Sequence, residues 1–215
     1  MRERLPYDRL APASPTAPPV LFEPPGALTG NRHEVWIAAA GSSGWGGAEV
    51  WVSLNDRSYD RLGTIWRGCV VGTLASPLPA AAEDPDTTSS FHVDVTPSNG
   101  VLHPGHPDDA DLYTTLCWVS DELISYSRST LVGPRLYCLD GHLRRGAFGT
   151  PVKHHDAGLP FARLNAAVFR HQYPAHLVGQ TIYVKLPAMN EHYQWLQGLD
   201  EVEPASLLLT GASAR

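Results

Sequence analysis

The sequence predicts an all-β protein, built as antiparallel β-sandwich or barrel domains after a proline-rich, extended N-terminal segment. Three observations support this prediction. Glycine and proline are abundant, with 19 of each in 215 residues, as is usual in turn-rich proteins. Six tryptophans and eight tyrosines favour strands. Short apolar runs alternate with turns about every eight to twelve residues, which is the spacing of sandwich and barrel strands.

A proline-rich segment and two β-domains are predicted along the chain. Residues 1–30 contain seven prolines and little apolar periodicity, so we expect an extended arm or linker that packs on a neighbour. Within it, residues 20–22 are apolar enough to add one strand. The first β-domain is predicted over residues 31–100 and the second over residues 101–215. A turn-rich stretch, PSNGVLHPGHPDDADL, marks the seam between them.

The stretch HEVWIAAAGSSGWGGAEVWVSLNDRSYDRLGT is the most informative part of the first half. It reads as two apolar strands around a Gly/Ser turn that contains Trp45, followed by a polar turn and a third strand. Further on, Phe91, Val93 and Val95 alternate with polar residues, which is the period of a half-buried strand. The strands predicted for this half lie at residues 35–40, 48–54, 61–67, 69–75 and 89–95.

Strands continue through the second half. Turn residues separate the apolar runs, including a DG pair at Asp140 and Gly141. Residues 161–169 fit either a short helix or an irregular strand. The other predicted strands lie at residues 112–119, 122–131, 136–139, 180–186 and 206–210.

Charge and composition disfavour several classes of protein. The net charge is −6 and the isoelectric point is about 5.9, which argues against specific nucleic-acid binding. The apolar runs are too short to span a bilayer, and the first residues lack the apolar core of a signal peptide. Cys69, Cys117 and Cys138 form no CxxC pair, so we expect them in the core and predict neither a disulfide-built nor a zinc-built fold.

The polar clusters predict no catalytic site, metal or cofactor. The sequence HPGHPDD could seat a divalent metal, but its interleaved prolines and glycine favour an exposed polar loop. Adjacent His154 and His155 would point apart on a strand, and we expect His155 to hydrogen-bond the backbone of its own loop. No nucleophile, phosphate-loop or metalloprotease motif is present, so the chain is predicted not to be an enzyme. The metal candidates are His103, His106, Asp108 and Asp109, and the carboxylates expected at the surface are Asp84, Asp86, Glu122 and Asp140.

The tryptophans allow two interpretations. Trp36, Trp51 and Trp66 lie in predicted strands, where such side chains usually belong to the core, although together with Trp45 they could form a sugar-binding platform. Trp45 lies in a turn, so we expect it to pack on a neighbouring protein or a ligand.

Several stretches resemble, in order, a family of phage tail proteins: the central hub or host-specificity protein at the tail tip of long-tailed bacteriophages and gene transfer agents. In the first half these are VWIA, WGGAEVWVS and SYDRLGTI. In the second half the similar stretches are a Glu-Leu-Ile strand, an Arg-Gly followed by Gly-Thr, a His-x-x-Gly-x-x-Phe element and a closing TIYVKL strand. The resemblance covers roughly residues 30–211 and corresponds to the C-terminal part of the hub region, as expected of a split-gene product or a fragment of a longer hub.

The resemblance implies a structural role in the virion. It implies assembly in the bacterial cytoplasm, a homotrimer around the tail axis, and contacts with the upstream hub, distal tail, tape-measure and fibre proteins during attachment and DNA delivery. The interface residues expected are Trp45, Trp195, Leu196, Arg144 and Arg145. At least one of the two arginines is expected to pair with a carboxylate or carbonyls inside the fold or at a subunit seam. The alternative is a carbohydrate-binding β-sandwich, for which loss of glycan binding on Trp45→Ala is the predicted test.

Overall fold

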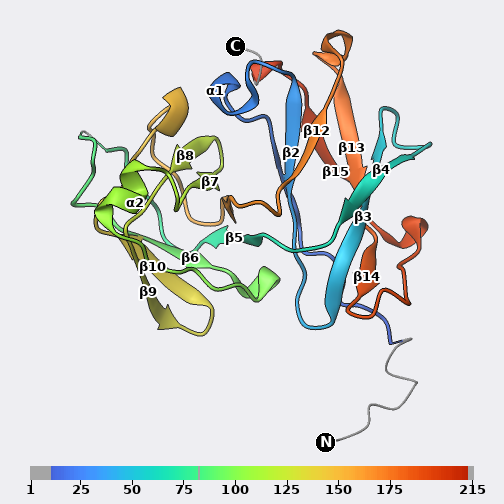
Figure 1. Cartoon of the computed structure of the whole chain (residues 1–215), viewed down its shortest axis with the longest axis horizontal. Coiled ribbons are helices and arrows are strands. Elements are labelled where there is room, and N and C mark those ends of the chain that lie inside the picture. Colours follow the sequence, from blue (N-terminus) through green and yellow to red (C-terminus); the bar gives the residue numbers. More distant parts are fainter. Residues whose placement is uncertain (1–10, 82, 213–215) are drawn as a thin grey trace, which may run out of the picture.

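A computed structural model describes residues 11–81 and 83–212, and it confirms the all-β prediction (Figure 1). The described strands form three antiparallel sheets. Helices are short: α1 spans Gly26–Thr29 and α2 spans Pro107–Asp111. Short 3₁₀ turns lie at Thr96–Ser98, Ala147–Gly149, Ala175–Leu177 and Leu199–Glu201. No helix in the described residues has the length and apolar character needed to cross a membrane.

Each sheet has a simple strand order. The three-stranded sheet is β1 (Val20–Phe22), β2 (Glu34–Ala38) and β12 (Phe169–Gln172). The seven-stranded sheet is β8 (Glu122–Ile124), β7 (Cys117–Val119), β11 (Pro160–Arg163), β5 (Val70–Leu74), β6 (Phe91–Asp94), β10 (Leu136–Asp140) and β9 (Arg128–Gly133). The five-stranded sheet is β14 (Ala188–Asn190), β3 (Trp45–Ser53), β13 (Thr181–Lys185) and β15 (Ala205–Leu208), with β4 (Asp60–Ile65) on the other edge of β3.

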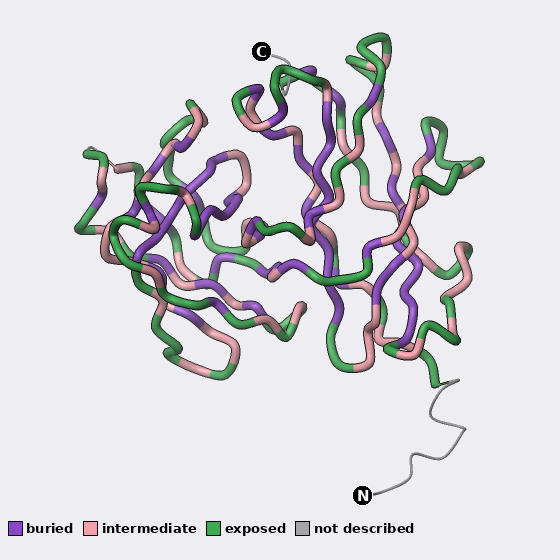
Figure 2. The backbone as a smooth tube through the Cα atoms, viewed as in Figure 1, coloured by how far each residue is buried: buried purple, intermediate pink, exposed green. Residues whose placement is uncertain are grey.

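Strand β2 lies between two cores, and Figure 1 shows it at the centre of the molecule. Successive side chains of a strand point to opposite faces. Trp36 and Ala38 therefore pack toward the seven-stranded sheet, in a core with Trp118, whereas Val35 and Ile37 pack toward the five-stranded sheet. This double burial explains why the sequence of β2 is a continuous apolar run and not an alternating one. Figure 2 shows the resulting buried centre of the backbone.

Residues 70–163 form the seven-stranded sheet as one continuous unit. The sheet curls around a core of its own, in which Tyr126, Phe91 and Phe161 are the largest fully buried side chains. The chain enters this unit after β4 and leaves it before β12. Residues 11–65 and 169–212 build the other two sheets, so the unit is inserted between two halves of its neighbour (Figure 1).

The sheets do not follow the predicted division of the chain near residue 100. Strand β6 precedes that point but pairs with β5 on one side and β10 on the other. A division by sheets falls near residues 68 and 165. The proline-rich segment also joins the fold: Ala17 donates its backbone N–H to Ala40, and Val20–Phe22 forms the one strand expected there. Residues 1–10 of the predicted arm lie outside the described residues.

Several predicted strands are shorter or divided. The strand predicted at 112–119 begins only at Cys117, because α2 and a turn occupy the residues before it. The segment 122–131 divides into β8 and β9 around residues 125–127. Residues 161–169 contain most of β11, a turn and the start of β12, so the strand alternative is correct and the helix alternative is wrong. Strand β14 was not predicted because its three residues are followed by a polar turn.

Candidate functional site

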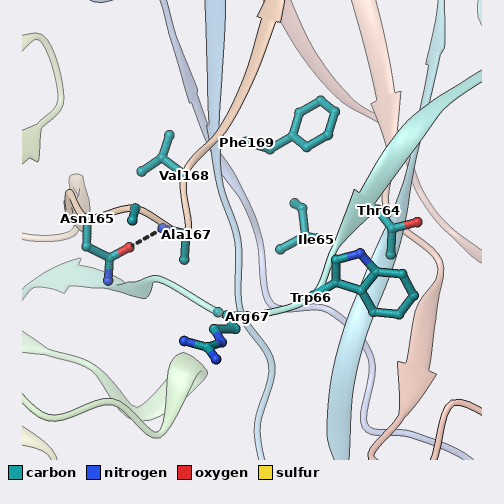
Figure 3. A pocket seen from close by; sticks show the side chains of 10 residues that line it. Thr64, Ile65, Trp66, Arg67, Asn165, Ala167, Val168 and Phe169 are labelled. Carbon is teal, nitrogen blue, oxygen red and sulfur yellow. Dashed lines mark hydrogen bonds between the residues drawn. The ribbon is translucent and has the colours of Figure 1, made fainter.

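A surface pocket of about 570 Å³ lies where the two linkers pass between the inserted unit and its neighbour (Figure 3). One wall is the end of β4 and the segment that leads to β5. The other wall is the turn that leads from β11 to β12. The pocket is lined by Thr64, Ile65, Trp66, Arg67, Gly68, Asn165, Ala166, Ala167, Val168 and Phe169. We call it the linker pocket. Its volume falls in the range of small-molecule sites, about 300–1,000 Å³.

Close packing fixes both walls of the linker pocket. A Cβ atom at Gly68 would lie 3.0 Å from the Cβ of Ala40, so glycine lets the first linker lie flat on the chain after β2. The next residue, Cys69, donates its N–H to the carbonyl of Ala39 at 2.8 Å. In the second wall, the Ala167 N–H donates to Asn165 Oδ1 at 2.8 Å and closes a tight turn. The pocket is thus preformed.

Trp66 is 57% exposed, although it follows a strand that packs on the core. Its ring meets Tyr193, which is 55% exposed, edge to face, with 5.3 Å between ring centroids. Such a contact holds both rings in a defined orientation while leaving aromatic surface in water. The structure thus corrects the core assignment of Trp66. Its chain neighbour Ile65 is the buried one, because the strand alternates its side chains between two faces.

Arg67 and Asn165 supply the polar groups of the linker pocket. Figure 3 shows them at one end of the pocket and Trp66 at the other. The exposed Arg67 side chain makes no ion pair within the described chain. Asn165 Oδ1 accepts hydrogen bonds from the Ala167 N–H and the Cys69 thiol, so its amide nitrogen keeps two donors for other partners.

A second site lies inside the inserted unit, and we call its four side chains the inner cluster: Asp86, Glu122, Arg145 and His155. Arg145 makes a two-pronged contact with Glu122, with Nε–Oε1 at 2.7 Å and Nη2–Oε2 at 2.9 Å. Its remaining donors reach the carbonyls of Pro79 and Lys153. The side chains of both Arg145 and Glu122 are 0% exposed. The expected pairing of an arginine with a carboxylate is therefore confirmed.

Histidine and backbone donors complete the shell of Glu122. His155 Nε2 lies 2.8 Å from Glu122 Oε2, and the Gly146 N–H donates to Oε1 at 2.9 Å. Burial acts to raise the pKa of Glu122, but the hydrogen bonds from His155 and Arg145 outweigh it and hold the pKa below its ordinary value. Glu122 is therefore an ionised acceptor, and His155 Nε2 carries the hydrogen.

Asp86 is the fourth member of the inner cluster. Its Oδ1 accepts hydrogen bonds from the N–H groups of Thr88 and Ser89, while Oδ2 lies 3.8 Å from Arg145 Nη1 without a hydrogen bond. Burial acts to raise its pKa as well, and bonds from Ser89 and Thr88 lower it overall. The sequence placed Asp86 and Glu122 at the surface and the His155 ring on its own loop. All three assignments are wrong. Glu122 and His155 are buried and contact each other, and Asp86 is buried beside Arg145 although its hydrogen bonds come from its own loop.

Arg144 lies on the opposite side of the chain from Arg145 and builds an outer cluster with Asp84, Asp111 and His142. Its guanidinium contacts both oxygens of Asp84 at 2.9 Å and Asp111 Oδ1 at 2.7 Å. His142 Nε2 reaches the same Asp111 oxygen at 2.8 Å. The side chain of Arg144 is 26% exposed. The interface role predicted for Arg144 stays a prediction, whereas Arg145 has no surface to offer a partner.

The HPGHPDD loop has a structural use. His106 and Asp109 cap helix α2 reciprocally: the His106 ring accepts from the Asp108 N–H, and Asp109 accepts from the His106 N–H at 2.7 Å. Asp108 is exposed. Within residues 11–81 and 83–212, no group of three or more His, Cys, Asp or Glu side chains is placed to hold a metal.

Of the other predicted surface acids, Asp84 pairs with Arg144 and Asp140 pairs with Arg128. His154 contacts Asp156 at the surface.

The remaining tryptophans have local partners. Trp36 is buried, as predicted, and Trp51 donates its indole N–H to Glu49. Trp45 packs beside Gly41 and donates its indole N–H to Thr16 at 3.1 Å, so its neighbour is the N-terminal segment of its own chain. Trp195 is half-buried and Leu196 is 47% exposed. An interface role for Trp45, Trp195 and Leu196 remains a prediction.

The three cysteines are free thiols. Cys69 and Cys117 are buried, as predicted, whereas Cys138 is half-buried on β10. Burial raises the pKa of Cys69 to about 11 and that of Cys117 to about 12.

Sequence reasoning missed the linker pocket because its walls come from segments about 100 residues apart. The available signal was Gly68, which separates the strands predicted at residues 61–67 and 69–75 and directly follows Trp66 and Arg67.

Comparison with known proteins gives one family match. Residues 69–162 match the model of a family described as Rcc01698-like, C-terminal. The name of this family comes from gene transfer agents, which are phage-like particles. The matched residues coincide with the inserted unit, which runs from β5 to β11. No curated protein matches the chain.

Proposed function

We propose that this chain is a structural component of the tail-tip hub of a phage or phage-like particle, where it links the tail tube to the tip or fibres. The observation that supports the proposal is that stretches resembling the tail-hub family also build the inner cluster. The Glu-Leu-Ile, Arg-Gly and His-x-x-Gly stretches that resemble the tail-hub family supply Glu122, Arg145 and His155 of the inner cluster. All three also lie within the residues that match the Rcc01698-like model.

The inner cluster is suited to a mechanical role. It ties the start of β8 to the loops that carry Pro79, Gly146 and Lys153, so four segments converge on one enclosed charge pair. A buried, fully hydrogen-bonded ion pair resists separation because either partner alone would be left charged in a nonpolar interior. Glu122 is closed off from solvent, so the cluster serves positioning and not contact with a substrate.

Exposed sheet edges provide surfaces for neighbouring subunits. Strand β9 ends the seven-stranded sheet, and its Leu131 and Val132 are 61% and 48% exposed. Strand β15 ends the five-stranded sheet with Leu208 exposed. A free edge with apolar side chains is a ready site for strand pairing with another chain. We expect these edges, together with Leu196, to contact other tail proteins or further copies in a trimer.

Incorporation into particles tests the proposal. An affinity tag on this chain in its natural host should copurify with intact tailed particles, and immunogold labelling should place it at the tail tip. Deletion of the gene should yield particles without a normal tip that fail to deliver DNA. Particles that assemble and deliver DNA normally after deletion would contradict the proposed role.

The β9 edge can be tested separately. Leu131→Lys should leave folding intact, because exposed positions away from the core change stability by about 0.5 kcal/mol or less. It should lower incorporation into particles by about tenfold or more, since charge is poorly tolerated at a packed interface. Leu112→Lys is the matched control: Leu112 is also exposed but lies in the turn after α2. Equal incorporation of both variants would show that β9 faces solvent in the particle.

A further inference from the structure

We propose that the linker pocket binds an acidic oligosaccharide, with one sugar ring stacked on Trp66 and a carboxylate held by Arg67 and Asn165. The inference needs only the isolated chain and is independent of the role in tail assembly. The structure brings together in one preformed hollow an exposed aromatic ring, an arginine that makes no ion pair with the described residues, and an anchored amide. No residue of this set contributes to the inner cluster or to a core.

The aromatic end of the pocket fits a sugar ring. A pyranose has an apolar face of C–H groups, which carry partial positive charge and pack on the negative face of an aromatic ring. Trp66 supplies the largest such face and is 57% exposed. The edge contact with Tyr193 restrains the ring before a ligand arrives, which lowers the entropic cost of binding.

The polar end of the pocket selects a carboxylate. Arg67 is the charged side chain among the lining residues, and no carboxylate lies among them to repel an anion. A guanidinium can donate two parallel hydrogen bonds to a carboxylate. The amide nitrogen of Asn165 adds two donors, and its orientation is fixed because its oxygen is already bonded to Ala167 N–H.

The arrangement favours a sugar acid over other anionic ligands. A nucleic-acid strand carries a charge on every residue, and a chain with a net charge of −6 and one cation at this site would repel it. Acidic peptides are recognised by clusters of arginines, whereas the lining of this pocket contains a single arginine. Without a carboxylate among the lining residues, the pocket has no acid–base pair for glycoside hydrolysis, so we assign binding and not cleavage.

Titration of the purified full chain tests the assignment, with intrinsic tryptophan fluorescence and calorimetry as readouts. The probes are oligomers of galacturonate, oligomers of mannuronate, and hyaluronan fragments. At least one should bind saturably, with a dissociation constant of about 1 mM or tighter. Its methyl-esterified or neutral counterpart should bind about tenfold more weakly, because the charge-assisted hydrogen bonds between the carboxylate and Arg67 are lost.

Variants connect the binding to the pocket. Trp66→Ala and Arg67→Gln should each weaken binding by about tenfold or more while thermal unfolding stays unchanged. Matched controls are Leu112→Ala, another exposed apolar residue, and Arg57→Gln, an exposed arginine in the β3–β4 turn. Absence of binding by all three acidic probes overturns the proposal. Binding that survives both pocket variants, or tighter binding of an oligothymidylate of equal length, overturns it as well.

Discussion

Arg144 and Arg145 are adjacent in the chain but occupy different environments. Arg145 belongs to the inner cluster, where its side chain is enclosed and pairs with Glu122. Arg144 belongs to the outer cluster, where it contacts Asp84 and Asp111 at the surface. Each arginine makes short, two-pronged contacts with a carboxylate. The contrast indicates that two ion pairs with similar hydrogen-bond geometry can contribute very different free energies of unfolding when their burial differs.

The physical reason is whether water can hydrate the carboxylate after its arginine is removed. If Arg144 is removed, Asp84 and Asp111 can be hydrated at the surface, where ion pairs contribute about 0–1 kcal/mol. If Arg145 is removed, Glu122 stays enclosed and keeps its hydrogen bonds from His155 and Gly146, but its charge loses the guanidinium that balances it. Breaking a buried pair in this way costs about 3–5 kcal/mol.

The largest expected effect comes from comparing the two arginines directly. Arg145→Met should lower the free energy of unfolding by about 3–5 kcal/mol, whereas Arg144→Met should lower it by less than about 1 kcal/mol. Urea unfolding monitored by tryptophan fluorescence measures both. If Arg145→Met does not fold, Arg145→Lys keeps the charge but loses the two-pronged contact, and it should lie between the wild type and Arg145→Met. Equal losses at the two positions would show that burial is not the deciding factor.

A second, smaller effect is the loss of stability at acidic pH. The folded-state pKa of Glu122 lies below its ordinary value of 4.5, so the unfolded chain binds a proton more readily than the folded one. The stabilisation from this difference is complete above about pH 4.5 and is lost as the pH falls toward the lower folded-state pKa. Glu122→Gln removes this titration. The wild type should therefore lose its stability advantage over Glu122→Gln on acidification.

Unfolding free energies measured between about pH 3.5 and 7 test this point. Asp86 also has a lowered pKa, but it is present in both proteins and largely cancels in the difference. Asp111→Asn is the matched control from the outer cluster. The pKa of Asp111 is lowered by hydrogen bonds from Arg144 and His142, but the group is exposed. A difference between wild type and Glu122→Gln that does not change with pH would contradict the ionised state assigned to Glu122.

The same contrast separates what the sequence could predict from what it could not. Local patterns predicted most strands, because alternation and turn residues act over a few positions. The burial of Glu122 depends on Arg145 and His155, which lie in other loops, and an acidic residue in a strand looks the same whether paired or hydrated. The Gly/Ser turn around Trp45 gave no sign that its indole N–H donates to Thr16 of the N-terminal segment. Long-range pairing decided each of these cases.

The smallest and most local test concerns two cysteines in the inserted unit. Cys117, like Arg145, is enclosed; its thiol donates to the Ile124 carbonyl, and burial raises its pKa to about 12. Cys138, like Arg144, is partly exposed. Because the thiolate is the reactive form and must be reached by the reagent, Cys138 should be labelled first by a maleimide at about pH 7–8. Mass spectrometry of peptides should find Cys117 labelled only under conditions that open the unit.

Cys69 serves as the internal control for this experiment. It is buried with a pKa raised to about 11, but it lies at the entry of the inserted unit and not inside its core. If the unit unfolds cooperatively, Cys117 in the wild type should become reactive at the urea concentration at which the Glu122–Arg145 contact is lost. This urea concentration should be lower for Arg145→Met. For Arg144→Met it should be nearly the same as for the wild type. Labelling of Cys117 before Cys138 would contradict the enclosed interior on which the comparison of the two arginines depends.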